Sequence, residues 1–300
     1  MKPARCGARG ALALFTLAGA IGLWPGGACA QAWLPDQGSL AASIDYNDTF
    51  YKYHFLPNGV EFDAGHTRTF TTAFGVAYSP TDRLSFVATL PYVSAEYHGN
   101  FPHPTIVDDG SYHGTLTDLR VEAHVQLLDG AFALAPYLAL LTPIKDYETL
   151  GHAAPGRGLT EGWVGTYVGR SLEPWLPRTY MQARLNYAFV ERVARVKHDR
   201  INIDVELGYF MTPRWSARVL AFWQDTDGGI PVPVPDTDPL FVHHDQLAAD
   251  RFLNVGAGTA FQLTGRTSVH AVYSFALHGQ NAHKVEHSLS LGFSQQLGRR

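Results

Sequence analysis

The sequence predicts an all-β protein, a transmembrane antiparallel β-barrel of twelve strands preceded by a cleavable signal peptide. Three observations support this prediction. The first thirty residues are laid out as an export signal, the rest of the chain alternates between apolar and polar residues with a period of two, and the connections between the alternating segments are by turns short and long. We therefore expect a signal peptide over residues 1–30 and an outer-membrane β-barrel over residues 31–300.

The amino-terminal segment has the three parts of a secretory signal. Basic residues at positions 2, 5 and 9 precede an apolar stretch, Ala11–Trp24, and Ala28-Cys29-Ala30 supplies the small residues of a cleavage site. Lipidation of Cys29 is an alternative, but Gly26 stands where a lipoprotein signal normally carries a leucine-like residue. The small residues of the cleavage site explain the segment without lipidation.

The composition of the mature chain excludes several classes of site. Both cysteines, Cys6 and Cys29, lie in the signal, so no disulfide, cysteine zinc site or thiol nucleophile is expected. Removing the signal leaves 20 Lys and Arg against 27 Asp and Glu, a net charge of −7 with histidine neutral. That sign argues against nucleic acid as a partner, because phosphates bind to basic faces. No later apolar run is long enough for a transmembrane helix, so a membrane-embedded form must be a closed barrel.

Period-two alternation is clearest in Thr117–Leu127, Met181–Phe189 and Ile201–Tyr209. Each places its apolar residues on one face and its polar residues on the other, as a strand does. In Thr160–Arg170 the facing is open, because Trp163 and Tyr167 compete with Val164 and Val168 for the outer face. The other predicted strands are Leu40–Tyr51, Thr67–Tyr78, Leu84–Ala95, Phe132–Ile144, Thr160–Arg170, Trp215–Gln224, Phe252–Leu263, Thr267–Leu277 and Val285–Leu297.

The predicted connections alternate in length, which is typical of outer-membrane barrels with tight periplasmic turns and longer extracellular loops. An even number of strands then places both termini on the periplasmic side. A soluble secreted β-sandwich also alternates, but its strands are usually shorter and its connections less regular. The short connections are residues 79–82, 128–130, 172–177, 212–214 and 263–265, and the long ones are residues 55–66, 96–114, 145–158, 190–200, 225–250 and 278–284.

Aromatic residues next to these connections are expected to form the two interfacial girdles of a barrel. Tyr78, Tyr209 and Trp215 lie beside short turns. Those nearer long loops are Phe50, Tyr92, Tyr187, Phe189, Trp223 and Phe275.

The middle of the chain resembles a known family. The strand Thr117–Ala123, the turn Leu127–Gly130, the strand Pro136–Leu140 and the step Thr142–Tyr147 are similar to outer-membrane transporters grouped as the meta-pathway phenol-degradation family, and Gly156–Leu159 fits the next element. The resemblance implies an outer-membrane barrel, folded by the barrel-assembly machinery, that takes up small and often aromatic molecules. The chain departs from the family pattern in having threonine rather than glycine at position 117, and in lacking a terminal aromatic residue.

The polar faces of the strands are expected to line the lumen if the apolar faces meet lipid. Strands adjacent in sequence are neighbours in a meander, so Arg184, Asp204, Glu206 and Arg218 should lie close together. The charges could set the selectivity of a narrow pore. Alternatively, opposite charges could pair with one another across the interior and leave little room for a solute to pass. The predicted pore-lining residues are Asp118, Arg120, Glu122, His124, Gln182, Arg184, Asn186, Asn202, Asp204, Glu206 and Arg218.

Two predicted loops carry residues that could bind a metal ion. Residues 225–250 include six aspartates, but Asp225-Thr226-Asp227-Gly228 lacks the spacing of a calcium loop, so a solvated acidic loop is the simpler interpretation. His98, His103 and His113 share a loop with Asp108 and Asp109, and His243-His244-Asp245 lies in another. Neither group has the spacing of a zinc motif. We predict exposed loop histidines, no metal site and no cofactor.

An outer-membrane acyl hydrolase would need a nucleophile beside a base. Ser288 follows His287, and His270 lies near Ser268 and Ser274, but adjacent side chains on a strand point to opposite faces and no acidic partner completes a triad.

We therefore predict an outer-membrane channel, not an enzyme, for passive passage of small aromatic or hydrophobic solutes. Its expected partners are the solute and outer-membrane lipids. The alternatives are a structural or surface-interaction barrel without an open pore and, third, a membrane acyl hydrolase.

Overall fold

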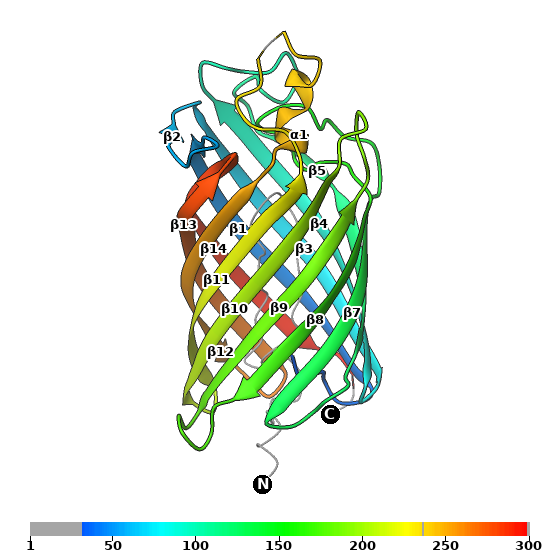
Figure 1. Cartoon of the computed structure of the whole chain (residues 1–300). Coiled ribbons are helices and arrows are strands. Elements are labelled where there is room, and N and C mark those ends of the chain that lie inside the picture. The colour runs from blue at the N-terminus through cyan, green and yellow to red at the C-terminus, as the bar shows by residue number, and fades with distance from the viewer. Residues whose placement is uncertain (1–31, 236, 299–300) are drawn as a thin grey trace.

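The computed structural model describes residues 32–235 and 237–298, which form one antiparallel sheet closed into a barrel (Figure 1). The predicted signal peptide lies outside the described residues, so its cleavage stays a prediction. Among the residues described, no helix is long and apolar enough to cross a membrane.

All twelve predicted strands are confirmed. Two short strands, β2 (Glu61–Phe62) and β5 (His113–Leu116), and one helical turn, α1 (His244–Leu247), lie at one end of the barrel (Figure 1). The long strands are β1 (Ser39–Phe55), β3 (His66–Thr81), β4 (Leu84–His98), β6 (Asp118–Val125), β7 (Phe132–Pro143), β8 (Glu161–Ser171), β9 (Thr179–Val190), β10 (His198–Thr212), β11 (Trp215–Gly228), β12 (Arg251–Gln262), β13 (Thr267–Gln280) and β14 (Ala282–Gln296).

Pairing of the first and last strands closes the barrel. β1 lies antiparallel to β14 from Ala41 opposite Gln296 to Phe55 opposite Ala282. β5 and β6 both pair with β4, and the break between them is at Thr117, whose amide donates to the carbonyl of Pro91 at 3.1 Å. The sheet therefore runs once round without a long unpaired edge, which is what a membrane-spanning sheet requires.

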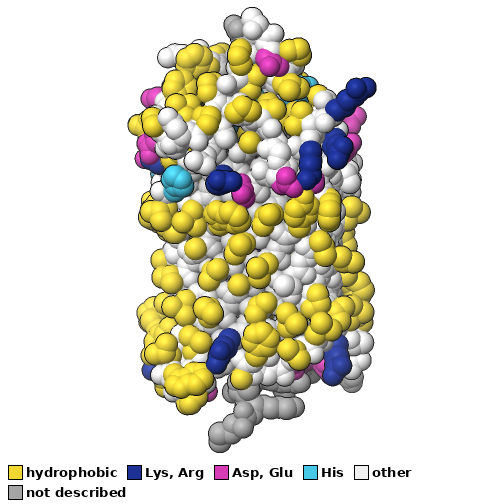
Figure 2. All heavy atoms as spheres, viewed as in Figure 1, with side chains coloured by type: hydrophobic (Ala, Val, Ile, Leu, Met, Phe, Trp, Pro, Cys, Tyr) yellow, Lys and Arg dark blue, Asp and Glu magenta, His cyan; other side chains and the backbone are white. Residues whose placement is uncertain are grey.

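The outer surface carries a broad apolar band. On the face shown in Figure 2, hydrophobic side chains cover much of the wall, with most charged side chains gathered beyond the band toward the α1 end. Outward-facing Leu138 and Leu277 are 64% and 60% exposed, an arrangement that only contact with lipid explains over so large an area. Tyr78, Tyr209 and Trp215 are exposed at one border of the wall, as the girdle prediction requires. The protein is therefore a membrane-spanning β-barrel.

Several of the predicted long loops are shorter in the structure, and two show the reason clearly. β10 already begins at His198, within predicted loop 190–200, and β13 and β14 are separated by Asn281 alone, at φ 51°. The reason is that a strand extending beyond the lipid needs no apolar outer face. The pairing can therefore continue through polar residues such as His278 and Lys284, where the apolar alternation stops.

Candidate channel interior

Every residue predicted to line the lumen is buried on the inner side of the wall, in phase with the outward-facing apolar residues. This placement follows from the alternation itself, because successive side chains of a strand point to opposite faces. The inward set comprises Asp118, Arg120, Glu122, His124, Gln182, Arg184, Asn186, Asn202, Asp204, Glu206 and Arg218.

Inward residues of β6 interact along one face of the strand. Glu122 lies between Arg120 and His124, with its Oε1 2.7 Å from Arg120 Nε and its Oε2 2.8 Å from His124 Nε2. Asp118, at the end of the strand, accepts a hydrogen bond of 2.6 Å from the Tyr147 hydroxyl, which belongs to the connection after β7. Glu122 is therefore neutralised locally, and Asp118 ties the end of the wall to a long loop.

A second polar ladder crosses β9, β10 and β11. Arg184 lies directly opposite Asp204 and forms an ion pair with it. The carboxylate of Glu206 accepts hydrogen bonds from Tyr180 Oη at 2.6 Å and from Arg218 Nη1 at 3.3 Å. The predicted proximity of Arg184, Asp204, Glu206 and Arg218 is confirmed as two ion pairs on adjoining strands.

The amides among the predicted residues extend this ladder. Gln182 Nε2 donates to Glu206 Oε1 at 3.2 Å, and Asn202 Nδ2 donates to Asn186 Oδ1 at 2.8 Å. Both contacts join β9 to β10 across the ladder. Gln182, Arg184 and Asn186 of β9 thus each have a polar partner on β10.

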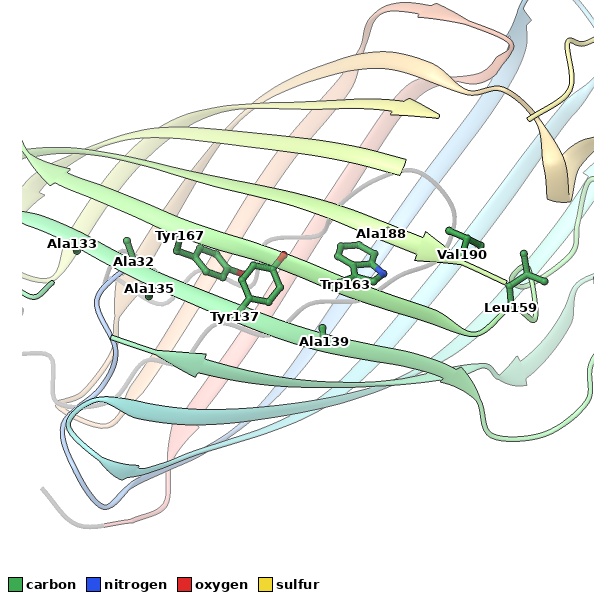
Figure 3. Close-up of a cluster of buried hydrophobic side chains, with 10 residues drawn as sticks. All are labelled: Ala32, Ala133, Ala135, Tyr137, Ala139, Leu159, Trp163, Tyr167, Ala188 and Val190. Atoms are coloured by element: carbon green, nitrogen blue, oxygen red, sulfur yellow. The ribbon is translucent and has the colours of Figure 1, made fainter. Parts of the chain in front are cut away.

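The open facing of β8 is settled by the structure. Trp163 and Tyr167 point inward, whereas Val164 is exposed on the outer face. Figure 3 shows Trp163 and Tyr167 beside Tyr137 of β7, all directed into the barrel among small alanines of the wall. We call Tyr137, Trp163 and Tyr167 the aromatic patch.

The aromatic patch adjoins the polar residues of β6. The His124 ring stacks near both tyrosines of the patch, at centroid distances of 5.3 and 5.4 Å and interplanar angles of 23° and 19°. The guanidinium of Arg120 lies 4.3 Å from the centre of the Trp163 ring. Sequence reasoning missed this patch because it treated aromatic residues as lipid-facing. The useful signal was Glu161, which shares a face with Trp163 and Tyr167.

The first described residues lie inside the barrel, at the end where the connections are short. The amide of Ala32 donates to Gln182 Oε1 at 3.2 Å, and the amide of Leu34 donates to Gln126 Oε1 at 2.6 Å. Gly169 of β8 allows this approach, because a Cβ there would lie 2.5 Å from the Trp33 ring and 2.6 Å from Ala32 Cβ. The segment thus occupies part of the lumen cross-section.

The hydrolase alternative gains no support from the strand facing. His287 of β14 points outward and Ser288 points inward, as their adjacency predicts. The Ser288 hydroxyl instead accepts a hydrogen bond of 2.8 Å from Asn47 Nδ2.

The loop predictions need two corrections. The aspartates of residues 225–250 do not gather into one solvated group, because Asp225 and Asp227 belong to β11 and pair with Arg251 and Lys197. The predicted exposure of the loop histidines is wrong for His103 and His244, which are buried. These histidines come from different loops, so spacing within one loop could not indicate that they meet.

Comparison with known proteins identifies the family. A family model described as "Putative MetA-pathway of phenol degradation" matches residues 55–286. The chain belongs to this family. No curated protein sequence matches the chain.

Solved structures show the same fold. The chain is similar to the COG4313 outer membrane channel from Pseudomonas putida F1, with a TM-score of 0.71 and 12% identity over 89% of this chain and 98% of that one. It is also similar to the beta domain of the Bordetella autotransporter BrkA, with a TM-score of 0.50 and 13% identity over 87% of this chain and 100% of that one. The translocator domain of NalP from Neisseria meningitidis has a TM-score of 0.50 and 14% identity over 87% and 89% of the two chains. Membership of the family confirms the resemblance found in the sequence, and these structures confirm the barrel fold.

Proposed function

We propose that this protein is a passive channel that carries small aromatic solutes across the outer membrane, with the predicted inward residues lining the path. The observation that carries the proposal is the contrast between the two faces of one wall. The outer face is apolar, whereas the inner face presents ion pairs beside the aromatic patch. Charged ladders inside a barrel serve to pass polar or ionic species.

The aromatic patch supports the choice of solute. Tyrosine and tryptophan rings bind other aromatic rings by offset stacking or edge-to-face contact. The guanidinium of Arg120 over Trp163 adds a cation beside that apolar surface, which suits a ring carrying an anionic group. The family description, which refers to phenol degradation, and the channel fold of the Pseudomonas putida protein point the same way.

The first test is electrical. Refolded residues 31–300 in a planar lipid bilayer should give discrete conductance steps, and a salt gradient should give a reversal potential close to zero because the lumen carries both signs of charge. Glu206→Gln should shift the reversal potential toward anions while the barrel remains folded. A folded barrel that never conducts would contradict the proposal.

The second test addresses the solute. Liposome swelling should be faster with benzenesulfonate than with cyclohexanesulfonate, because the two differ in aromaticity and share one charge. Trp163→Ala should remove the difference, and Val164→Ala, on the lipid face of the same strand, should leave it in place. Equal rates for the two solutes in the natural protein would refute the aromatic preference without refuting a channel.

A barrel without an open pore is the second candidate, favoured by one observation. Ala32 and Leu34 are hydrogen-bonded to inward glutamines at the short-turn end, where they would restrict a path. If the barrel has no open pore, the planar bilayer should show no conductance steps until residues 31–36 are deleted.

A further inference from the structure

Five histidines meet above the barrel wall, at the end where the long connections lie. They come from five separate segments, which are β1 (His54), the connection after β4 (His103), the connection after β7 (His152), α1 (His244) and β14 (His283). His103, His152 and His244 surround the carboxylate of Asp245, which follows His244. No sequence motif links these residues, so only the fold brings them together.

The separations within this group suit ligands of one metal ion. Asp245 Oδ2 lies 3.2 Å from His152 Nδ1 and 3.8 Å from His103 Nε2, and Asp245 Oδ1 lies 3.4 Å from His244 Nε2. All four potential ligand atoms lie within 4.8 Å of one another. Four ligands at about 2.0–2.2 Å from a tetrahedral zinc ion are about 3.3–3.6 Å apart, close to the carboxylate–imidazole separations seen here.

Two of the imidazoles are oriented by hydrogen bonds from their other nitrogen. His244 Nδ1 donates to the carbonyl of Phe241 at 2.7 Å, and His152 Nε2 donates to the carbonyl of Phe101 at 3.1 Å. In each case the other ring nitrogen faces the carboxylate of Asp245. Metal-ligating histidines are held in this way, because a second partner fixes both the tautomer and the ring plane.

The backbones of two ligands are held by one further carboxylate. Asp108 Oδ2 accepts hydrogen bonds from the amides of His103 at 2.9 Å and His152 at 3.1 Å, and Asp108 Oδ1 accepts one from the amide of Ala153 at 2.9 Å. Asp108 therefore joins the connection after β4 to the connection after β7. It is a positioning residue, because its oxygens are engaged by amides and not directed at the cluster.

Four inner atoms of the cluster lack a hydrogen-bond partner, whereas Asp245 Oδ1 accepts a hydrogen bond of 3.0 Å from His283 Nε2. Both nitrogens of His103, Nδ1 of His152 and Oδ2 of Asp245 are buried without a hydrogen bond, and the His103 side chain is only 2% exposed. Leaving such groups buried and unsatisfied is unfavourable.

We propose that His103, His152, His244 and Asp245 bind one divalent transition-metal ion of the zinc type. Three imidazoles and one carboxylate match the nitrogen and oxygen ligands of Zn²⁺, whereas Ca²⁺ and Mg²⁺ require oxygen ligands. The bound ion joins the connections after β4, β7 and β11 across the barrel mouth. The site is separate from the proposed solute path, and it can exist whether or not the barrel conducts.

The test is zinc binding by the whole barrel, purified in detergent without a polyhistidine tag. Equilibrium dialysis against ZnCl₂ should give one Zn²⁺ per barrel, while CaCl₂ gives none. Co²⁺ in place of Zn²⁺ should produce the intense visible absorption of tetrahedral nitrogen and oxygen coordination. No stoichiometric zinc at micromolar concentration would overturn the proposal, as would a Co²⁺ spectrum of octahedral type.

Matched variants locate the ion. His103→Gln, His244→Gln and Asp245→Asn should each weaken Zn²⁺ binding at least about 100-fold, beyond the 10–100-fold effect of losing a residue that only orients a ligand. His98→Gln and His113→Gln, at exposed positions bordering the same connection, should leave the affinity unchanged. Heat-modifiable migration on gels checks that each variant is folded.

His54, His152 and His283 form an alternative group that shares one histidine with the proposed site. Zinc binding that is lost in His54→Gln and His283→Gln, but kept in His103→Gln and His244→Gln, would overturn the proposed ligand set.

Discussion

A substitution at Glu206 tests whether water reaches the ion pairs inside the barrel. Its carboxylate and the guanidinium of Arg218 form an ion pair in which the side chains are 1% and 3% exposed. Glu206→Gln keeps the shape of the side chain and an oxygen that can accept from Tyr180, so the change removes mainly the charge. Taking one partner from a buried ion pair costs about 3–5 kcal/mol, because the other charge is left uncompensated. We expect the free energy of unfolding to fall by that amount.

The assay is equilibrium unfolding in urea of the barrel in phospholipid vesicles, followed by tryptophan fluorescence. Asp225→Asn is the matched control, since it breaks an ion pair with Arg251 whose side chains are 27% and 51% exposed. Exposed pairs contribute about 0–1 kcal/mol. The double variant Glu206→Gln/Arg218→Gln should lose less than the sum of the two single variants, because the two residues are coupled. A loss below about 1 kcal/mol in Glu206→Gln would mean that water surrounds the pair, and the reasoning from burial would be refuted.

Three further changes test other parts of the structure. Leu138→Arg, midway along β7 on the lipid face, should lower the free energy of unfolding in vesicles by about 2–4 kcal/mol. Phe132→Arg, at the end of the same strand, should lower it by only about 0–1 kcal/mol. Equal losses would contradict the placement of the middle of β7 at the centre of the bilayer. Gly169→Val should push Ala32 and Trp33 out of the lumen, because the added side chain would overlap them. A thiol probe should therefore label Ala32→Cys faster when Gly169→Val is also present than when it is absent. An unchanged labelling rate would show that residues 32 and 33 do not pack against Gly169. Asp108→Asn should weaken zinc binding about 10–100-fold through the backbones of His103 and His152, with the Co²⁺ spectrum keeping its tetrahedral type; an altered spectrum would mean that Asp108 is itself a ligand.

The wall of the barrel was predictable because a single rule governs it. Wherever a strand crosses lipid, each outward residue must be apolar, so Leu119–Val125 or Ile201–Tyr209 reveals both the strand and its facing. This rule does not apply beyond the membrane border. The sequence therefore did not reveal the start of β10, the end of β13 or the start of β14. It also could not settle β8, where both candidate faces carry large apolar residues.

The interior was predictable only as far as register could be inferred. Arg184 and Asp204 lie on consecutive strands of a meander, so their contact followed from the order of the strands. The histidine cluster depends instead on how three connections fold over one another, and residues such as His103, His152 and His244 are far apart in sequence. Periodicity has no bearing on such contacts, because loop conformation is set by tertiary packing and not by a repeating pattern.

The pairing of β1 with β14 also determines when the barrel can close during folding. Ala41 and Gln296, near the two ends of the described chain, are direct partners, and their pairing must follow delivery of the last strand. Until then β1 and β13 each present an open row of amides and carbonyls, which is hazardous in water and unsatisfied in lipid. Closure of the sheet must therefore wait for β14. A chain shortened before β14 is expected to leave β1 and β13 unpaired rather than to form a smaller barrel.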